Sequence, residues 1–193
     1  VGEGVQTVAE TGDPTKLGEE LVAAGTDVMS YLVGVPMFFE LQPASTRRRL
    51  AEGDKPAKGG DPITARTQTV PGDLIFTPDH SMFSGISMLA PSPDWFTASH
   101  GNAVISGNAA GEKVWQKSFH YETLPYDAGT DSGTTFTSED APTTPAEAST
   151  VFTTTTSDIG IFVNEAGDEV LPVMTWDCSI ANVMYKCEFD ENC

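Results

Sequence analysis

Cysteine, positive charge and long apolar runs are all scarce in this 193-residue chain. The three cysteines, Cys178, Cys187 and Cys193, all lie in the last sixteen residues, with a spacing that suits zinc poorly. An odd number cannot pair fully within one chain. In an oxidising compartment either Cys178–Cys187 or Cys187–Cys193 would close a small loop, leaving one thiol free or bonded to another chain.

Basic residues number 10 against 28 acidic ones, so the net charge is −18. Such a chain repels a phosphate backbone, which argues against nucleic acid as a partner. The acidity fits solubility, a saline medium or the recruitment of cations. Six basic residues fall between positions 47 and 66, either as a solvated loop or as a contact for a sulfated glycan or lipid head groups: Arg47, Arg48, Arg49, Lys55, Lys58 and Arg66.

No apolar run is long enough to cross a bilayer, because the longest, residues 31–39, is broken by Gly34 and Pro36. No signal peptide opens the chain, so a secreted protein is expected here in processed form. The chain also lacks the Asn-x-Ser/Thr acceptor of N-glycosylation.

The usual catalytic patterns are missing as well, namely H-E-x-x-H, G-x-S-x-G and the P-loop. His80, His100 and His120 recur every twenty residues in unrelated surroundings, so we treat the spacing as chance, with a histidine-based zinc or catalytic site as the alternative. We predict that the chain is not an enzyme.

Two short acidic runs stand out. Residues 90–96 hold Asp94 after two prolines, which stiffen the backbone and cannot pair in a central strand. Residues 125–133 hold Asp127 and Asp131, with Gly129 and Gly133 letting the chain curl so that the two carboxylates converge. Rigid turns rich in carboxylate oxygen suit a hard cation such as Ca²⁺, whereas the simpler reading makes these aspartates helix caps and turn formers. The second run is not an EF-hand, since it lacks Asp at position three and Glu at position twelve.

The remaining pattern predicts an antiparallel β-sandwich with one short N-terminal helix. Asp13 and Pro14 start the helix, an apolar stripe packs it on a core, and Gly25 ends it. Many short strands separated by turns follow, which is typical of a sandwich. We expect strands over 64–70, 82–89, 112–124 and 150–157, the last a Thr-rich stretch that could instead carry O-glycans, and a closing hairpin of 159–163 and 170–176. Residues 96–105 are expected to form either another strand or a loop pair. Residues 28–41 are expected to be extended, with a short helical turn at their start as the alternative, 42–62 and 138–149 to be loops, and Trp95, Trp115 and Trp176 to lie in the core.

Four blocks of the chain resemble the spondin domain, the N-terminal domain type of the secreted matrix proteins F-spondin and mindin. They are residues 4–12 (Gly-Val-Gln-Thr-Val-Ala-Glu-Thr-Gly), 88–96 (Met-Leu-Ala-Pro-Ser-Pro-Asp-Trp-Phe), 126–133 (Tyr-Asp-Ala-Gly-Thr-Asp-Ser-Gly) and 141–147 (Ala-Pro-Thr-Thr-Pro-Ala-Glu). The resemblance covers about residues 2–175 and implies a sandwich similar to C2 domains, with residues 1–12 as a surface segment. It also implies one Ca²⁺ bound by Asp94, Asp127 and Asp131.

The resemblance has one departure, since the family has more strand sequence before its first block and only three residues precede Gly4 here. We therefore expect a spondin-like domain over 1–177 that lacks its first strands, followed by a cysteine-bearing tail over 178–193. The bare sheet edge would be covered by a neighbouring chain or by the tail, through Ile180, Val183, Tyr185 and Phe189.

Together these features predict a secreted, Ca²⁺-binding adhesion or matrix-binding module without catalysis. Its partner would be a protein, an anionic glycan or a matrix component, with peripheral contact to lipid left open. The alternatives are a structural accessory subunit docked into a larger assembly, and another oxidising compartment in place of the extracellular space.

Overall fold

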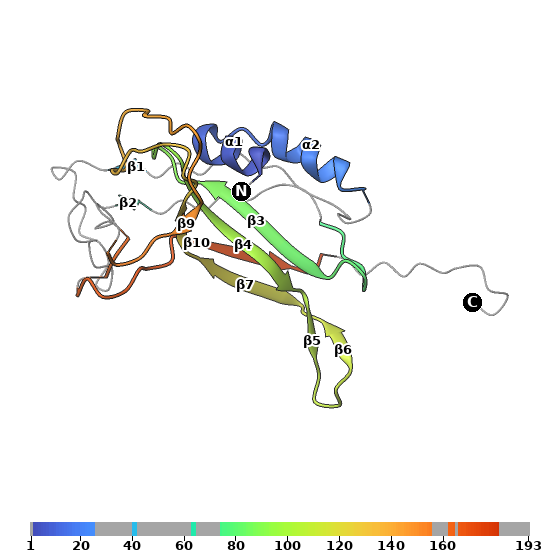
Figure 1. Cartoon of the computed structure of the whole chain (residues 1–193). Helices are drawn as coiled ribbons and strands as arrows, with labels where there is room; N and C mark the ends of the chain where they lie inside the picture. The colour runs from blue at the N-terminus through green and yellow to red at the C-terminus, as the bar shows by residue number, and fades with distance from the viewer. Residues whose placement is uncertain are drawn as a thin grey trace.

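Short antiparallel strands and two N-terminal helices make up the computed structural model, which describes residues 2–25, 40–41, 63–64, 74–155, 162–164 and 166–181 (Figure 1). The helices are α1 (Glu3–Thr11) and α2 (Thr15–Ala23). The strands are β1 (Glu40–Leu41), β2 (Ile63–Thr64), β3 (Met82–Met88), β4 (Trp95–Ala103), β5 (Ile105–Gly107), β6 (Lys113–Trp115), β7 (Ser118–Thr123), β8 (Pro125–Asp127), β9 (Thr150–Val151) and β10 (Met174–Ser179).

The main sheet has four antiparallel strands in the order β3-β4-β8-β9. Strands β10 and β7 form a second antiparallel pair, and β5–β6 and β1–β2 are two smaller pairs. The predicted all-β antiparallel class is therefore confirmed. The likeness to C2 domains stays a prediction.

Strand β4 shows how the two faces of the main sheet are covered, because successive side chains of a strand point to opposite faces. Phe96 and Ala98 face α1, where Phe96 packs with the buried Ala9 and stacks on Tyr126. Trp95 and Thr97 face the other way, and the Thr97 hydroxyl donates to Thr123 Oγ1 of β7 at 2.8 Å. The sheet thus lies between α1 on one side and the β7–β10 pair on the other.

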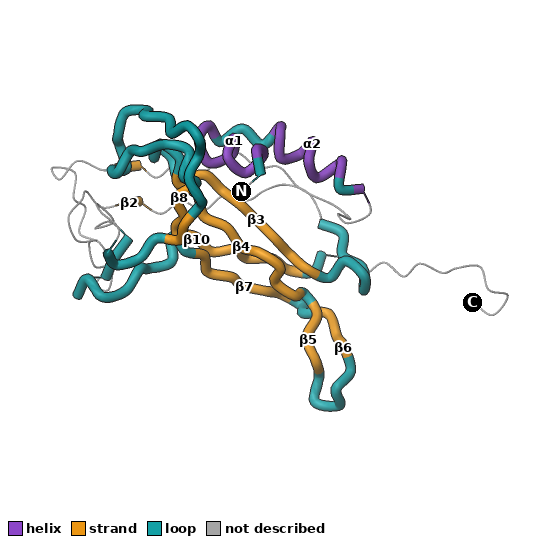
Figure 2. Tube along the Cα trace, in the orientation of Figure 1, coloured by secondary structure: helices purple, strands orange, loops and turns teal. Residues whose placement is uncertain are grey.

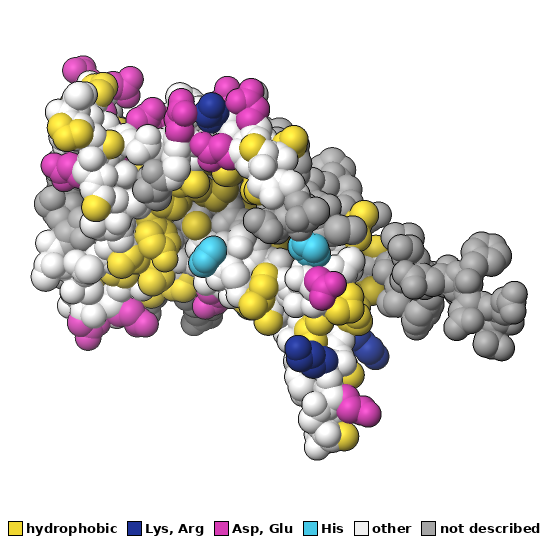
Figure 3. Space-filling view, turned by 45° about the vertical axis from the view of Figure 1, so that its right-hand side comes forward, with side chains coloured by type: hydrophobic (Ala, Val, Ile, Leu, Met, Phe, Trp, Pro, Cys, Tyr) yellow, Lys and Arg dark blue, Asp and Glu magenta, His cyan; other side chains and the backbone are white. Residues whose placement is uncertain are grey.

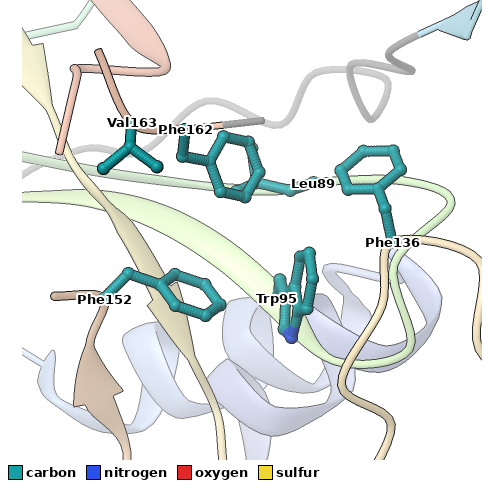
Figure 4. Packing of buried hydrophobic residues seen from close by; sticks show 6 residues of the cluster. All are labelled: Leu89, Trp95, Phe136, Phe152, Phe162 and Val163. Atoms are coloured by element: carbon teal, nitrogen blue, oxygen red, sulfur yellow. The ribbon is translucent and has the colours of Figure 1, made fainter. Parts of the chain in front are cut away.

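Two groups of side chains fill the inner layer. Trp95 forms edge-to-face contacts with three phenylalanines, Phe136, Phe152 and Phe162, and Figure 4 shows these rings grouped with Leu89 and Val163. A second aromatic group joins Phe83 of β3 to Phe119, Tyr121 and Trp176 of the β7–β10 pair. Edge-to-face aromatic pairs add roughly 0.5–1.5 kcal/mol each beyond the area that they bury.

The N-terminal region differs from the sequence interpretation. Residues 1–12, expected as a surface segment, contain helix α1, whose Val8 and Ala9 are buried on the apolar face of the helix. The predicted helix is α2, and Asp13 does accept the Thr15 N–H at its start. However, α2 packs on α1 and buries no residue, and Val22 is 66% exposed, so its apolar stripe does not enter the core.

Several strand predictions also need correction. The strand expected over 112–124 is two strands, β6 and β7, and residues 174–176 belong to β10, which pairs with β7. The predicted hairpin is reduced to one antiparallel bridge between Val163 and Val170. Trp115 is not a core residue: it is 36% exposed on β6. Most of the strand expected at 64–70 and most of the loop at 42–62 lie outside the described residues.

Candidate functional site

The two acidic runs meet at one end of the main sheet, where long loops leave the strands (Figure 2). Strand β4 starts directly after Asp94, strand β8 ends at Asp127, and the pairing register sets Trp95 opposite Asp127. The Ala128 N–H donates to the Asp94 carbonyl oxygen at 3.2 Å and continues this pairing. The antiparallel pairing of β4 with β8 therefore places Asp94 and Asp127 beside each other.

The turn before β4 is closed by Ser92. Its hydroxyl donates to the Leu89 carbonyl oxygen, and the Trp95 N–H donates back to Ser92 Oγ at 3.1 Å. The Leu89 N–H also donates to the Trp95 carbonyl oxygen at 2.9 Å. With the two prolines these bonds fix the backbone on which Asp94 is carried.

Asp94 is fully buried, with 0% of its surface exposed. Its Oδ2 accepts the Thr130 N–H at 2.8 Å and the Asp131 N–H at 3.0 Å, so this one oxygen ties the two acidic runs together. Its Oδ1 is buried and has no hydrogen-bond partner among the residues that the structure describes. A buried, unpartnered carboxylate oxygen is costly, because it has lost its water without gaining a donor.

The other two aspartates organise the second loop. Asp127 Oδ1 accepts the Gly129 N–H at 2.7 Å. The carboxylate of Asp131 accepts the Gly133 N–H on Oδ1 at 2.7 Å and the Ala141 N–H on Oδ2. Both Asp131 oxygens are thus engaged, although each carboxylate oxygen has a second lone pair. The turn-forming role that the sequence left open is therefore filled by Asp127 and Asp131.

Like charges crowd this end of the sheet. Burial is the main cause that raises the pKa of Asp127 to about 6, with Asp94, Glu147 and Asp131 adding repulsion. Burial also raises the pKa of Asp94, against the lowering effect of its hydrogen bonds. In a partly desolvated site, a neighbouring carboxylate makes ionisation harder, and a bound cation would offset that cost.

As the side chains stand, no three His, Cys, Asp or Glu groups in the described part of the chain are arranged to hold a metal ion. The structure brings Asp94 and Asp127 together and joins Asp131 to them through its backbone N–H. Glu147 also belongs to this neighbourhood and was missed by the sequence analysis, although it ends the block at 141–147.

A histidine lies in a separate place, on the β7–β10 pair. His120 Nδ1 is 2.8 Å from Asp177 Oδ1, and its Nε2 is 3.9 Å from Glu122 Oε1. A shallow depression of about 350 Å³ lies here, lined by Ser118, Phe119, His120, Asp177, Cys178 and Ser179. Because the two ring nitrogens face different carboxylates, the three groups do not converge on one point. Cys178 is half-buried in β10. Both predicted disulfide alternatives involve Cys187, which lies outside the described part of the chain.

No helix in the described ranges is long and apolar enough to span a membrane. The chain is similar to spondin-1 of Rattus norvegicus, with 29% identity over 147 residues that cover 75% of this chain and 15% of that protein. It is similar to spondin-2 of Homo sapiens, with 29% identity over 153 residues that cover 79% of this chain and 38% of that protein. It thus spans well under half the length of these relatives. The family model for Spondin_N matches residues 1–172, and the chain therefore belongs to the spondin N-terminal domain family.

Proposed function

We propose that this domain is a Ca²⁺-binding adhesion module of the extracellular matrix that acts without catalysis. Family membership carries the extracellular location and the matrix-type role with it. The observation that supports the ion is Asp94 Oδ1, a fully buried carboxylate oxygen without a partner, at the meeting point of two acidic loops.

The oxygen donors present are of the kind that a hard cation prefers, although their side chains do not converge on one point as they stand. Asp94 and Asp127 would supply carboxylate oxygen from the two loops, and Asp131 would supply its remaining lone pairs. Ca²⁺ takes about six to eight oxygen ligands, so carbonyl groups and water would complete its shell. When bound, the ion would neutralise carboxylates that otherwise repel one another, and it would join the turn before β4 to the loop after β8. Its role in this proposal is to rigidify the loops that a partner meets.

The non-catalytic part of the proposal is supported by the sequence, which lacks any nucleophile–base pattern. A screen for hydrolase and transferase activity tests it. Turnover that is lost on substitution of His80, His100 or His120 would contradict the proposal and favour an enzyme.

The alternative is an accessory subunit whose sheet is extended by a neighbour. One observation favours it: among the described residues β3 lies at an edge of the main sheet, and its Met82 is 62% exposed. An edge with free backbone groups and apolar side chains can accept another strand. Size-exclusion chromatography of the isolated chain separates the two, because a matrix module is expected to be monodisperse alone and a docked subunit is expected to self-associate.

The decisive experiment measures thermal unfolding and calorimetric titration of the chain with Ca²⁺ and with a chelator. A ligand that binds only the folded state stabilises it by about 2.7 kcal/mol at 100 times its dissociation constant, so the melting temperature should rise with Ca²⁺. Asp94→Asn and Asp131→Ala should lose this rise, while the exposed Asp140→Asn should keep it. If Asp131→Ala melts like the parent with and without Ca²⁺, the ion site is misassigned.

A further inference from the structure

The β5–β6 hairpin projects from the body of the domain, away from the acidic loops (Figures 1 and 2). Its register pairs Ile105 with Trp115, Ser106 with Val114 and Gly107 with Lys113. The side chains of Val114 and Trp115 are both exposed, at 40% and 36%. Lys117 follows two residues after Trp115 and is also exposed.

This arm carries most of the positive charge of the described residues. These residues contain three basic side chains in all, and the first, Lys16, is already flanked by Glu3 and Glu19 at 3.6 and 3.7 Å. By contrast, Lys113 and Lys117 form no ion pair within the described part of the chain. In Figure 3 dark blue side chains lie on the projecting part of the molecule, where magenta side chains lie as well, and other acidic side chains are spread over the body.

The arm is preformed. Its turn is closed by Asn108, whose Oδ1 accepts the N–H groups of Ala110 and Glu112, both at 2.9 Å. Its base is fixed by the Gln116 N–H, which donates to the Val104 carbonyl oxygen at 3.0 Å, and by the Ile180 N–H, which donates to the Lys117 carbonyl oxygen at 2.9 Å. Little conformational entropy would be lost when a partner binds such a rigid arm.

We propose that the β5–β6 arm binds a sulfated glycosaminoglycan through Lys113, Trp115 and Lys117. The two ammonium groups would pair with sulfate or carboxylate groups of the polymer, and the indole between them would pack against a sugar ring. The two lysines are four positions apart, so their Cα atoms are at most about 13 Å apart and one linear polyanion can meet both. This inference deepens the proposed matrix-binding function by naming a surface and a class of partner.

A polymer suits the arm better than a bilayer does. The turn at its tip, residues 108–112, carries Asn108, two alanines and Glu112, and contains no large apolar side chain to enter a membrane. The aromatic ring lies further back, on β6, where a chain can lie along the side of the arm.

The test measures binding of the full chain to immobilised heparin as a function of salt. The double variant Lys113→Gln/Lys117→Gln should bind about tenfold more weakly at low salt, with a smaller dependence on salt concentration, because two of its charge contacts are gone. Trp115→Ala should weaken binding without changing that dependence. Lys16→Gln removes the same charge from α2 and should bind like the parent. Chemically desulfated heparin should bind far more weakly than heparin.

Four results would overturn the inference. They are no retention of the parent chain, equal retention of the parent and the double variant, loss of retention only when Arg47, Arg48 and Arg49 are changed to Gln, and binding to phosphatidylserine vesicles in place of heparin. Ca²⁺ titration of the same variants keeps the two proposals apart. The double variant should bind Ca²⁺ like the parent. A chain that fails to bind Ca²⁺ would therefore contradict the proposed ion site without affecting the heparin test of the arm.

Discussion

The backbone of Gly129 lies directly against the backbone of Glu147. The Glu147 N–H donates to the Gly129 carbonyl oxygen at 2.7 Å, and a Cβ atom on Gly129 would lie 2.7 Å from the Glu147 carbonyl oxygen. Nearby, the Thr143 hydroxyl donates to the same Gly129 oxygen at 2.8 Å, and the Ser149 hydroxyl donates to the Asp127 carbonyl oxygen at 2.7 Å. The loop after β8 is thus closed against residues 141–149, which hold the acidic end of the sheet in place.

This contact predicts that Gly129→Ala destabilises the domain. Gly129 has φ of +74°, where an L side chain costs roughly 1–2 kcal/mol, and the backbone of Glu147 would also have to move. We expect the free energy of unfolding to fall by about 2–4 kcal/mol, measured by urea denaturation.

Gly101→Ala is the matched control. Gly101 has φ of +62°, but nothing lies within 4 Å of the place where its Cβ would be. Only the backbone strain remains, so a loss of about 1 kcal/mol is expected. Equal losses at the two glycines would mean that the packing of Gly129 on Glu147 adds nothing.

Trp95 and Trp115 are expected to differ widely in what their truncation to alanine costs in stability. Trp95 is fully buried among Phe136, Phe152 and Phe162, so Trp95→Ala should cost about 3–5 kcal/mol or prevent folding. Trp115 is partly exposed on the projecting arm, and Trp115→Ala should cost less than about 1 kcal/mol. Circular dichroism during heating measures both. A large loss for Trp115→Ala would show that the arm is part of the folding core.

The same contrast shows what the sequence could predict. Alternation along 82–103 and the turn residues between strands predict β3, β4 and an antiparallel class, because these patterns depend on local chemistry. The nearness of Asp94 and Asp127 was implied only by the family resemblance, because the pairing of β4 with β8 is not a local feature of the sequence. The exposure of Trp115 was not predictable, because the sequence around it resembles that of any half-buried strand. Only the pairing of β5 with β6 shows that these two strands form a separate arm.

The burial of helix α1 and the bonds around Asp94 were beyond reach for a related reason. Val5, Val8 and Ala9 are spaced for the apolar face of a helix, but Ala9 is covered by Phe96 of β4, which lies far away in the chain. The unpartnered Oδ1 of Asp94 depends on how Thr130 and Asp131 direct their N–H groups to Oδ2. Such long-range arrangements have no signature in the local sequence.

His120 is predicted to titrate above its ordinary range. Its hydrogen bond with Asp177 is the main cause that raises its pKa, with a smaller contribution from Glu122. A raised pKa means that the interaction stabilises the folded state below the unfolded pKa of about 6.5, and that this stabilisation is lost as the pH rises through the folded pKa. NMR titration of the imidazole measures the pKa of His120 in the folded state.

In that experiment Asp177→Asn should lower the His120 pKa more than Glu122→Gln does, because the distances from the ring are 2.8 and 3.9 Å. Both carboxylates are exposed, so neither substitution should affect the fold. A larger effect from Glu122→Gln would show that the ring prefers the other carboxylate in solution.

The acidic end of the sheet predicts an unusual response to pH when no cation is present. The folded pKa of Asp127 is about 6, against an ordinary value of 3.8. Between these values the folded state binds more protons than the unfolded state, so the free energy of unfolding falls as the pH rises through this window. In the presence of a chelator, the contribution of Asp127 should therefore lower the melting temperature of the domain between about pH 4 and pH 6.

Comparison of variants isolates the contribution of Asp127. Asp127→Asn removes the titrating group and should flatten this drop, whereas Asp140→Asn, at an exposed position, should leave it unchanged. Saturating Ca²⁺ should oppose the drop in the parent, because the ion binds the ionised carboxylates and so stabilises the charged form of the folded state. An Asp127→Asn variant that keeps the full pH dependence in chelator would assign the drop to other groups and remove the electrostatic support for the ion site.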